Sequence, residues 1–183
     1  NKHEWQFRDE NTPYWTHLVL TAIYVINNNW TSDEVLLALL HDVIEDQFKP
    51  GLYEEIESIF WKTILEWSIL LSKIRNWIKI DNKEYYLEIS KNISLLKVKW
   101  CDRLSNLYWT YFWPDIEWNL DYLYKTKKEI IPLIEREFPD LASQMYDIID
   151  YLKENTVISD EIKSRINDLK KIIDIKDSLC LWK

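Results

Sequence analysis

Apolar residues recur along much of the chain at the three- and four-residue spacing that marks the buried face of a helix. Over residues 14–27 these positions include Leu18, Ala22 and Ile26, each four residues from the next. A second helix is predicted to open at Thr31, which precedes an acidic first turn, and to run through Val43. No stretch alternates apolar and polar residues for long enough to predict a strand.

The same spacing predicts helices over most of the remaining chain. One or two helices are expected over 54–74, and single helices over 82–91, 92–111, 140–153 and 159–175. The strongest loop signal is Lys49-Pro50-Gly51, and Pro114 is expected to end the 92–111 helix. We therefore predict an all-α chain, with one domain over residues 1–153 and a helical extension over 154–183 packed on the same domain.

Glycine and tryptophan depart from ordinary usage. The 183 residues include one glycine, Gly51, and 11 tryptophans, whereas an average glycine content of about 7% gives roughly 13 glycines. So few glycines exclude a Gly-rich phosphate loop. They also argue against a β-sandwich or a Rossmann sheet, whose turns need positive φ. Composition therefore supports the helical interpretation.

Charge and cysteine content narrow the partners and the compartment. A net charge of −8 repels a nucleic-acid backbone, so we expect no nucleic-acid partner. Cys101 and Cys180 do not form a disulfide framework, and no stretch has the pattern of a membrane span or a signal peptide. These features predict a cytoplasmic protein without a membrane partner. Because the chain lacks an initial methionine, we expect it to be incomplete at that end.

The densest group of ionisable residues is His41-Asp42-Val43-Ile44-Glu45-Asp46, which directly follows the apolar run 35–40. On a helix, His41 and Glu45 are neighbours four residues apart, and so are Asp42 and Asp46. One surface would then present an imidazole and three carboxylates. Acids at the C-terminal end of a helix are unfavourable without a positive partner, and a divalent cation would supply that charge.

A further acid, Asp102, interrupts the apolar 92–111 helix, with Asn106 one turn later. A carboxylate in such surroundings needs a partner. The residues leave two choices open: a structural ion pair with Arg103 or a lysine, or a role as a fourth metal ligand. Imidazole and carboxylate ligands without a thiolate favour Mn²⁺, Fe²⁺ or Co²⁺ over a structural zinc. The residues alone predict a metal-dependent hydrolase on a helical scaffold.

At these residues the sequence resembles the HD-domain phosphohydrolases, in particular the hydrolase domain of RelA/SpoT homologues and the stand-alone small alarmone hydrolases. Four ordered elements carry the resemblance: Gln6-x-Arg8, Pro13-Tyr14-x-x-His17, the HDxxED sequence that begins at His41, and Asp102-Arg103-Leu104-x-Asn106. The fold that the resemblance implies is a single-domain HD-type helical bundle.

The resemblance also implies a role for eight side chains. It implies His17, His41, Asp42 and Asp102 as the ligands of one metal ion, usually Mn²⁺; Glu45 and Asp46 as the acids that position and deprotonate the attacking water; and Arg8 and Asn106 as contacts to the nucleobase and the sugar. The implied reaction is that of the stringent response: removal of the 3′-pyrophosphate from the alarmone (p)ppGpp, which releases GDP or GTP and pyrophosphate. Metal-bound water and a nearby carboxylate are suited to this hydrolysis.

Several positions differ from the family pattern where a substrate would be recognised. Asp9 replaces a basic residue, and Tyr108 and Trp109 stand where arginine and threonine are common. A phosphohydrolase of another nucleotide (a nucleoside monophosphate, a dNTP or NADPH) is therefore an alternative. A second alternative is a non-catalytic module that senses metal or nucleotide. Retention of both Glu45 and Asp46 favours catalysis. The oligomeric state is not predicted.

The tryptophans suggest one more hypothesis. Trp5, Trp30 and Trp61 fall where the resembling family commonly has glycine. One glycine and 11 tryptophans together approach the roughly 13 glycines of average usage. Under this hypothesis, some positions written as tryptophan are encoded by a codon, with UGA as the suspect, that the source organism reads as glycine. The tryptophans would then come from translation of the gene with the wrong genetic code. The alternative is an aromatic-rich helical protein from an AT-rich gene.

Overall fold

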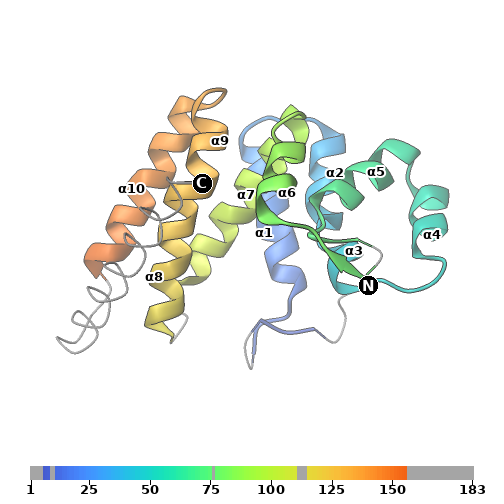
Figure 1. The fold of residues 1–183 in the computed structure, drawn as a ribbon, viewed down its shortest axis with the longest axis horizontal. Helices are drawn as coiled ribbons and strands as arrows, with labels where there is room; N and C mark the ends of the chain where they lie inside the picture. Colours follow the sequence, from blue (N-terminus) through green and yellow to red (C-terminus); the bar gives the residue numbers. More distant parts are fainter. Residues whose placement is uncertain (1–5, 9–10, 76, 111–114, 156–183) are drawn as a thin grey trace, which may run out of the picture.

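The computed structural model describes residues 6–8, 11–75, 77–110 and 115–155, which form a helical bundle with one small hairpin (Figure 1). The elements are α1 (Trp15–Asn27), α2 (Ser32–Leu40), α3 (Val43–Asp46), α4 (Leu52–Ile59), α5 (Lys62–Leu71), β1 (Ile74–Arg75), β2 (Ile78–Lys79), α6 (Asn82–Ile89), α7 (Ile93–Thr110), α8 (Ile116–Lys125), the π-helix η1 (Thr126–Ile130), α9 (Ile131–Glu135) and α10 (Pro139–Asn155). The predicted all-α class is confirmed, and 54–74 contains two helices.

Helices α1 and α7 occupy the middle of the bundle (Figure 1). The short helices α2 to α5 lie on one side of this pair, and the run from α8 to α9 lies with α10 on the other side. Helix α1 packs against both α2 and α7. Side chains on the facing surfaces of these three helices therefore meet in the interior.

Two clusters of buried apolar side chains hold these layers together. The larger one includes Trp100 and Tyr85, the two largest of the fully buried side chains among the described residues. The smaller cluster lies between α3, α4 and α5 and consists of Val43, Ile44, Leu52, Ile56 and Leu65. This cluster begins directly after Asp42, so its burial fixes the position of the preceding turn.

A buried ion pair joins α2 to α7. Thr31 caps α2 in a reciprocal capping box with Glu34, at the N-cap that the sequence predicts. The Glu34 side chain, 2% exposed, also accepts hydrogen bonds from Lys97 Nζ and Ser94 Oγ, each at 2.9 Å. Burial would raise the pKa of Glu34, but these hydrogen bonds outweigh it and lower the pKa. The N-terminal end of α2 is thereby fixed against α7.

The predicted helix from Thr31 to Val43 is interrupted in the structure. Helix α2 ends at Leu40, a turn follows at residues 41–42, and α3 begins at Val43. The ring of His41 donates from Nδ1 to the carbonyl oxygen of Ala38 at 2.8 Å. A continuous helix would pair that carbonyl with the backbone N–H of Asp42. The side chain of His41 competes for this acceptor, which accounts for the turn.

A two-stranded hairpin follows α5, although the sequence predicts no strand. Ile74 pairs with Lys79 and Arg75 with Ile78 in antiparallel register, which leaves a loop of two residues, 76–77. Trp77 has φ of +67°, a conformation that glycine normally adopts. Strands of two residues are too short to show alternation, and the loop lacks the glycine that marks such turns.

Several predictions lie outside the described residues. They include the 159–175 helix, Cys180, Asp9, Trp5 and nearly all of the 154–183 extension. The boundary after residue 153 stays a prediction, and α10 continues past it to Asn155. Within the ranges that the structure describes, no helix combines the length and the apolar character needed to cross a membrane.

Candidate active site

Four side chains from three segments meet in the interior. His17 lies on α1, His41 and Asp42 on the turn between α2 and α3, and Asp102 on α7. His41 Nε2 is 3.1 Å from Asp42 Oδ2 and 3.6 Å from Asp102 Oδ1. His17 Nε2 is 3.2 Å from Asp102 Oδ1 and 3.6 Å from Asp42 Oδ2, and the two Nε2 atoms are 3.3 Å apart. The structure thus brings together all four side chains that we expected as metal ligands.

This donor set fits a divalent transition-metal ion. Ligand atoms about 2.1 Å from one ion lie roughly 3.0–3.4 Å from each other, close to the observed 3.1–3.6 Å. His41 donates from Nδ1 to Ala38, so Nε2 is the ring nitrogen that faces the cluster and would give its lone pair to a metal ion that displaces its proton. Nδ1 of His17 lies 2.8 Å from Ser105 Oγ, which leaves its Nε2 for the cluster as well. Two imidazoles and two carboxylates suit Mn²⁺, Fe²⁺ or Co²⁺.

The electrostatics of the cluster also favour a cation. Burial would lower the pKa of His41, but the carboxylates of Asp42 and Asp102 raise it to about 10. Burial lowers the pKa of His17. Burial would raise the pKa of both aspartates, yet it is held below the usual range, chiefly by Lys99 for Asp102 and by His41 for Asp42. Two ionised carboxylates thus adjoin two imidazoles.

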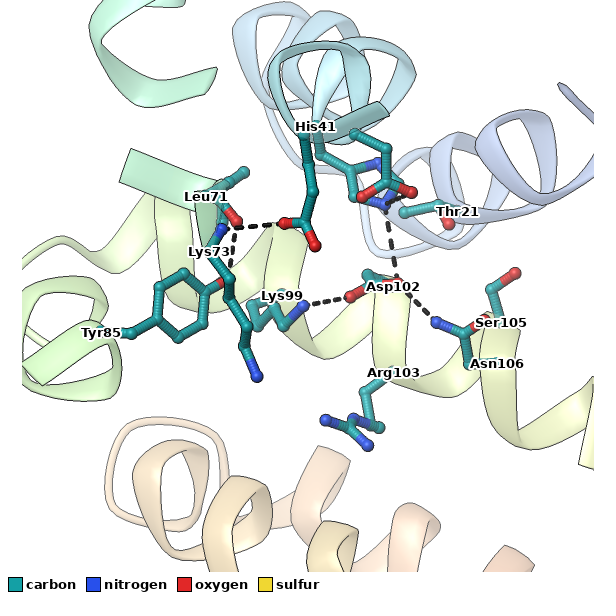
Figure 2. A network of polar contacts seen from close by, with 12 residues as sticks. Thr21, His41, Leu71, Lys73, Tyr85, Lys99, Asp102, Arg103, Ser105 and Asn106 are labelled. Carbon is teal, nitrogen blue, oxygen red and sulfur yellow. Dashed lines mark hydrogen bonds and ion pairs between the residues drawn. The ribbon is translucent and has the colours of Figure 1, made fainter. Parts of the chain in front are cut away.

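Asp102 is held by two outer partners (Figure 2). Lys99 Nζ donates to Oδ2 at 2.5 Å, and Asn106 Nδ2 donates to Oδ1 at 2.7 Å. Such hydrogen bonds orient a metal ligand and tune its affinity. An ion pair, one of the two choices that the sequence left open, is therefore present, but with Lys99 and not with Arg103. It leaves Oδ1 facing the imidazoles, so the pair and a ligand role are compatible.

The acid pair of the HDxxED sequence lies on α3, beside this cluster. Glu45 Oε2 accepts a hydrogen bond from the backbone N–H of Lys73 at 2.8 Å. Asp46 Oδ2 accepts one from Gln6 Nε2 at 2.9 Å. The turn at residues 41–42 therefore divides the four ionisable residues into two that join the cluster and two acids with partners of their own.

Arg8 and Asn106, expected to contact the nucleoside, contact each other. Arg8 Nη2 donates to Asn106 Oδ1. The guanidinium carbon lies 5.2 Å from the ring centre of Trp109 and 6.0 Å from that of Tyr14. Arg8 Nη1 is buried and has no hydrogen-bond partner in the described part of the chain. An acceptor on a ligand would satisfy this N–H.

A group of three cations, Lys73, Lys99 and Arg103, lies beside the metal-ligand cluster. Figure 2 shows the side chains of Lys73 and Arg103 extending into the same region next to Asp102. Arg103 stacks on Tyr122 at 4.3 Å, and its buried Nε has no hydrogen-bond partner among the described residues. Burial and the charges of Lys99 and Arg103 lower the pKa of Lys73 to about 8. Such a group suits a polyanion such as pyrophosphate.

None of these three cations was predicted from the sequence as a site residue. Lys99 and Arg103 are four residues apart on α7, and that spacing was a usable signal because it places them on one face. Lys73 precedes the hairpin, and nothing in its sequence neighbourhood points to the site. Only the three-dimensional packing brings Lys73 to Glu45.

The helical fold and the cluster of two histidines and two aspartates are similar to those of an HD-type helical domain. No protein-family model matches the chain. A solved structure of a metazoan SpoT orthologue that hydrolyses ppGpp superposes with a TM-score of 0.67 at 19% identity, covering 86% of this chain and 90% of that one. The two proteins therefore share a fold.

Sequence relatives are (p)ppGpp enzymes. The chain is 32% identical over 113 residues to the bifunctional (p)ppGpp synthase/hydrolase SpoT of Escherichia coli K12, covering 57% of this chain and 16% of the relative. It is 23% identical, in an alignment of 204 positions, to the guanosine-3′,5′-bis(diphosphate) 3′-pyrophosphohydrolase of Spiroplasma citri, covering 97% of this chain and 26% of the relative. The chain thus spans about a sixth to a quarter of these relatives. It carries an HD-type domain similar to those of RelA/SpoT-type hydrolases.

Proposed function

We propose that this domain is a metal-dependent phosphohydrolase that removes the 3′-pyrophosphate of (p)ppGpp. The observation that carries the proposal is the position of the metal-ligand cluster directly beside a group of three cations. Similarity to proteins named guanosine-3′,5′-bis(diphosphate) 3′-pyrophosphohydrolase, among them that of Spiroplasma citri, supports the choice of substrate. A cytoplasmic location is part of the proposal and is in keeping with the free, buried thiol of Cys101.

The metal would be held by His17, His41, Asp42 and Asp102, with Mn²⁺ as the proposed ion. When bound, it would lower the pKa of a water molecule and neutralise phosphate charge. Glu45 and Asp46 would take the proton of the attacking water. The hydrogen bond from the backbone of Lys73 fixes the direction of the Glu45 carboxylate.

The substrate would lie across both the cations and the nucleoside contacts. Lys73, Lys99 and Arg103 would neutralise the charge of the pyrophosphoryl group while water attacks its phosphorus, the P–O3′ bond breaks and the ribose 3′-oxygen takes up a proton. Arg8 would offer to the base its Nη1–H, which has no acceptor among the residues that the structure describes, and Asn106 would face the sugar. The products would be pyrophosphate and GDP or GTP.

Pyrophosphate release from ppGpp, measured with and without Mn²⁺, tests the proposal. Glu45→Gln should lower kcat by about 10²–10⁴-fold while the Mn²⁺ content stays at the wild-type level. His41→Ala should lose the metal as well as the activity. Glu57→Gln, at an exposed position on α4, is the matched control. Metal-loaded, folded protein without turnover of ppGpp would refute the substrate, and full activity of Glu45→Gln would refute the mechanism.

A phosphohydrolase that acts on another nucleotide is the second candidate. The observation that favours it is Trp109, whose ring lies 5.2 Å from the Arg8 guanidinium. Stacking on an aromatic ring accepts any base, so this wall does not by itself select guanine. A panel of ppGpp, GMP, dGTP and NADPH under the same conditions separates the candidates by kcat/KM.

A further inference from the structure

The segment from Gln6 to Tyr14 is fastened to the candidate site by three side chains. The Gln6 amide donates to Asp46, the Arg8 guanidinium to Asn106, and the Tyr14 hydroxyl to Asp42. Its two ends are also joined, because Tyr14 N–H donates to the carbonyl of Gln6 at 2.8 Å. We call residues 6–8 and 11–14 the N-terminal strap.

Tyr14 contacts both parts of the site. Its Oη donates to Asp42 Oδ2 at 2.5 Å, and this is the same oxygen that lies 3.1 Å from His41 Nε2. The tyrosine ring lies 6.0 Å from the guanidinium carbon of Arg8 and packs edge-on against the ring of His17 at 5.7 Å. Because a carboxylate oxygen can only accept, the hydroxyl of Tyr14 is the donor in this hydrogen bond.

A second connection runs from Arg8 through Asn106. Asn106 Oδ1 accepts from Arg8, while Asn106 Nδ2 donates to Asp102 Oδ1, the oxygen 3.2 Å from His17 Nε2. Arg8 is thus one side chain away from each of the two metal-ligand carboxylates. Tyr14 and Asn106, the two side chains in between, each donate to the carboxylate oxygen that faces the imidazoles.

We propose that Tyr14 is a positioning residue that couples nucleotide binding at Arg8 to metal binding at Asp42. This inference rests on the proposed function, since it takes the ligand of Arg8 to be a nucleotide. A metal ion that fixes Asp42 also fixes Tyr14 beneath Arg8, so the nucleotide then meets an ordered guanidinium. A nucleotide that fixes Arg8 likewise orders the carboxylate for the metal. The ligand that binds first loses the conformational entropy of ordering Tyr14, Arg8 and Asp42, so the second ligand binds more tightly. This coupling is the same in either order of binding.

The test measures binding without turnover. The Mn²⁺ dissociation constant is determined by electron paramagnetic resonance of the free ion, with and without saturating GDP, which carries no 3′-pyrophosphate. The Mn²⁺ that GDP itself binds is measured in a titration without protein and subtracted. In the wild-type protein GDP should tighten Mn²⁺ binding by about fivefold or more. In Tyr14→Phe, which keeps the ring and loses the hydroxyl, Mn²⁺ alone should bind about tenfold more weakly. The tightening by GDP should shrink severalfold.

Tyr24→Phe is the matched control, because Tyr24 lies on α1, the helix that Tyr14 precedes, and packs against the main core. It should keep both the Mn²⁺ affinity and the GDP effect of the wild type, and thermal melting checks that both variants fold. Equal GDP effects in Tyr14→Phe and the wild type would overturn the proposal, as would wild-type protein whose Mn²⁺ affinity ignores GDP. Coupled binding without ppGpp hydrolysis would refute only the proposed reaction.

Discussion

In each candidate metal-ligand histidine, Nε2 faces the cluster and Nδ1 contacts a second group on the other side of the ring. Nδ1 of His41 is bonded to a backbone carbonyl, whereas Nδ1 of His17 meets the hydroxyl of Ser105 at 2.8 Å. A backbone partner cannot be removed by substitution, but a serine can. A substitution of Ser105 can therefore measure how much the contact to Nδ1 of His17 contributes to metal affinity.

Ser105→Ala should weaken Mn²⁺ binding about tenfold, because the His17 ring loses the contact that orients it. Ser68→Ala is the matched control: Ser68 is also buried, and its hydroxyl has no hydrogen-bond partner in the described residues. Isothermal titration with Mn²⁺ gives both affinities. Equal weakening in the two variants would assign the effect to general loss of packing and not to His17.

Lys73 carries a pH dependence that follows from its surroundings. Its pKa is lowered to about 8 by burial and by Lys99 and Arg103, so the ammonium loses its proton as the pH rises through that value. The neutral amine attracts pyrophosphate less strongly. The KM for ppGpp should therefore rise severalfold between pH 7 and pH 9.

Lys73→Arg separates this effect from other titrations, since arginine stays protonated over the whole range. The KM of this variant should be flat between pH 7 and pH 9. The inhibition constant of inorganic pyrophosphate is a second measurement of the same anion binding, and it should rise with pH in the wild-type protein in the same way. The same pH dependence in both proteins would show that another group titrates.

At the scale of elements, sequence periodicity predicted the helices well and the local geometry at the site poorly. Helix α1 begins and ends within one residue of the predicted range 14–27. The predicted buried face is only partly correct: Leu18 and Ala22 are buried, but Ile26 is 54% exposed, and the polar side chains of His17 and Thr21 are buried instead. The HDxxED sequence was expected on one helix, yet the ring of His41 takes a backbone acceptor and a turn results. Side-chain competition of this kind leaves no periodic signal. Apolar periodicity therefore predicts where helices lie, but it does not predict a helix end that a polar side chain causes.

The hairpin β1–β2 was missed for a different physical reason. A two-residue hairpin loop is usually announced by Asn-Gly, where both residues take positive φ. Here the sequence is Asn76-Trp77, and Trp77 stands at φ of +67° with 77% of its surface exposed. The backbone of Trp77 has a conformation typical of glycine, but the residue type gives no sign of it.

Trp77→Gly should relieve the backbone strain at this turn. Its ring contacts Phe48 at 5.2 Å, so Trp77→Ala is the necessary reference because both variants lose the ring. Trp77→Gly should be more stable than Trp77→Ala by about 1 kcal/mol, the cost of a Cβ in left-handed geometry. This corresponds to about 2–4 °C in Tm for a chain of this size. Equal Tm values would show that the turn accommodates a Cβ without strain.

At the scale of the whole molecule, the tryptophans fall into different structural environments. Trp100 is fully buried in the main core, and Trp30 packs against it and against Phe138. Trp61, by contrast, is 50% exposed at the start of α5, and Trp77 occupies a glycine conformation. Glycine in place of Trp30 would leave a gap, whereas glycine at position 77 suits the backbone. The glycine-codon hypothesis therefore has its strongest structural support at a position that the family comparison did not single out.

We predict that Trp77 is encoded by UGA and that the protein made by its own ribosomes carries glycine there. The expected turn sequence is then Asn-Gly, which matches a two-residue hairpin loop in this register. The codons at positions 5, 30, 61 and 77 in the source gene, together with peptide mass spectrometry of the native protein, decide the matter. A UGG codon at position 77, or a native peptide with the mass of tryptophan, would rule the hypothesis out at that turn. Because this hairpin follows directly on Lys73, whose backbone N–H holds Glu45, the result also decides which turn positions one of the two candidate catalytic acids.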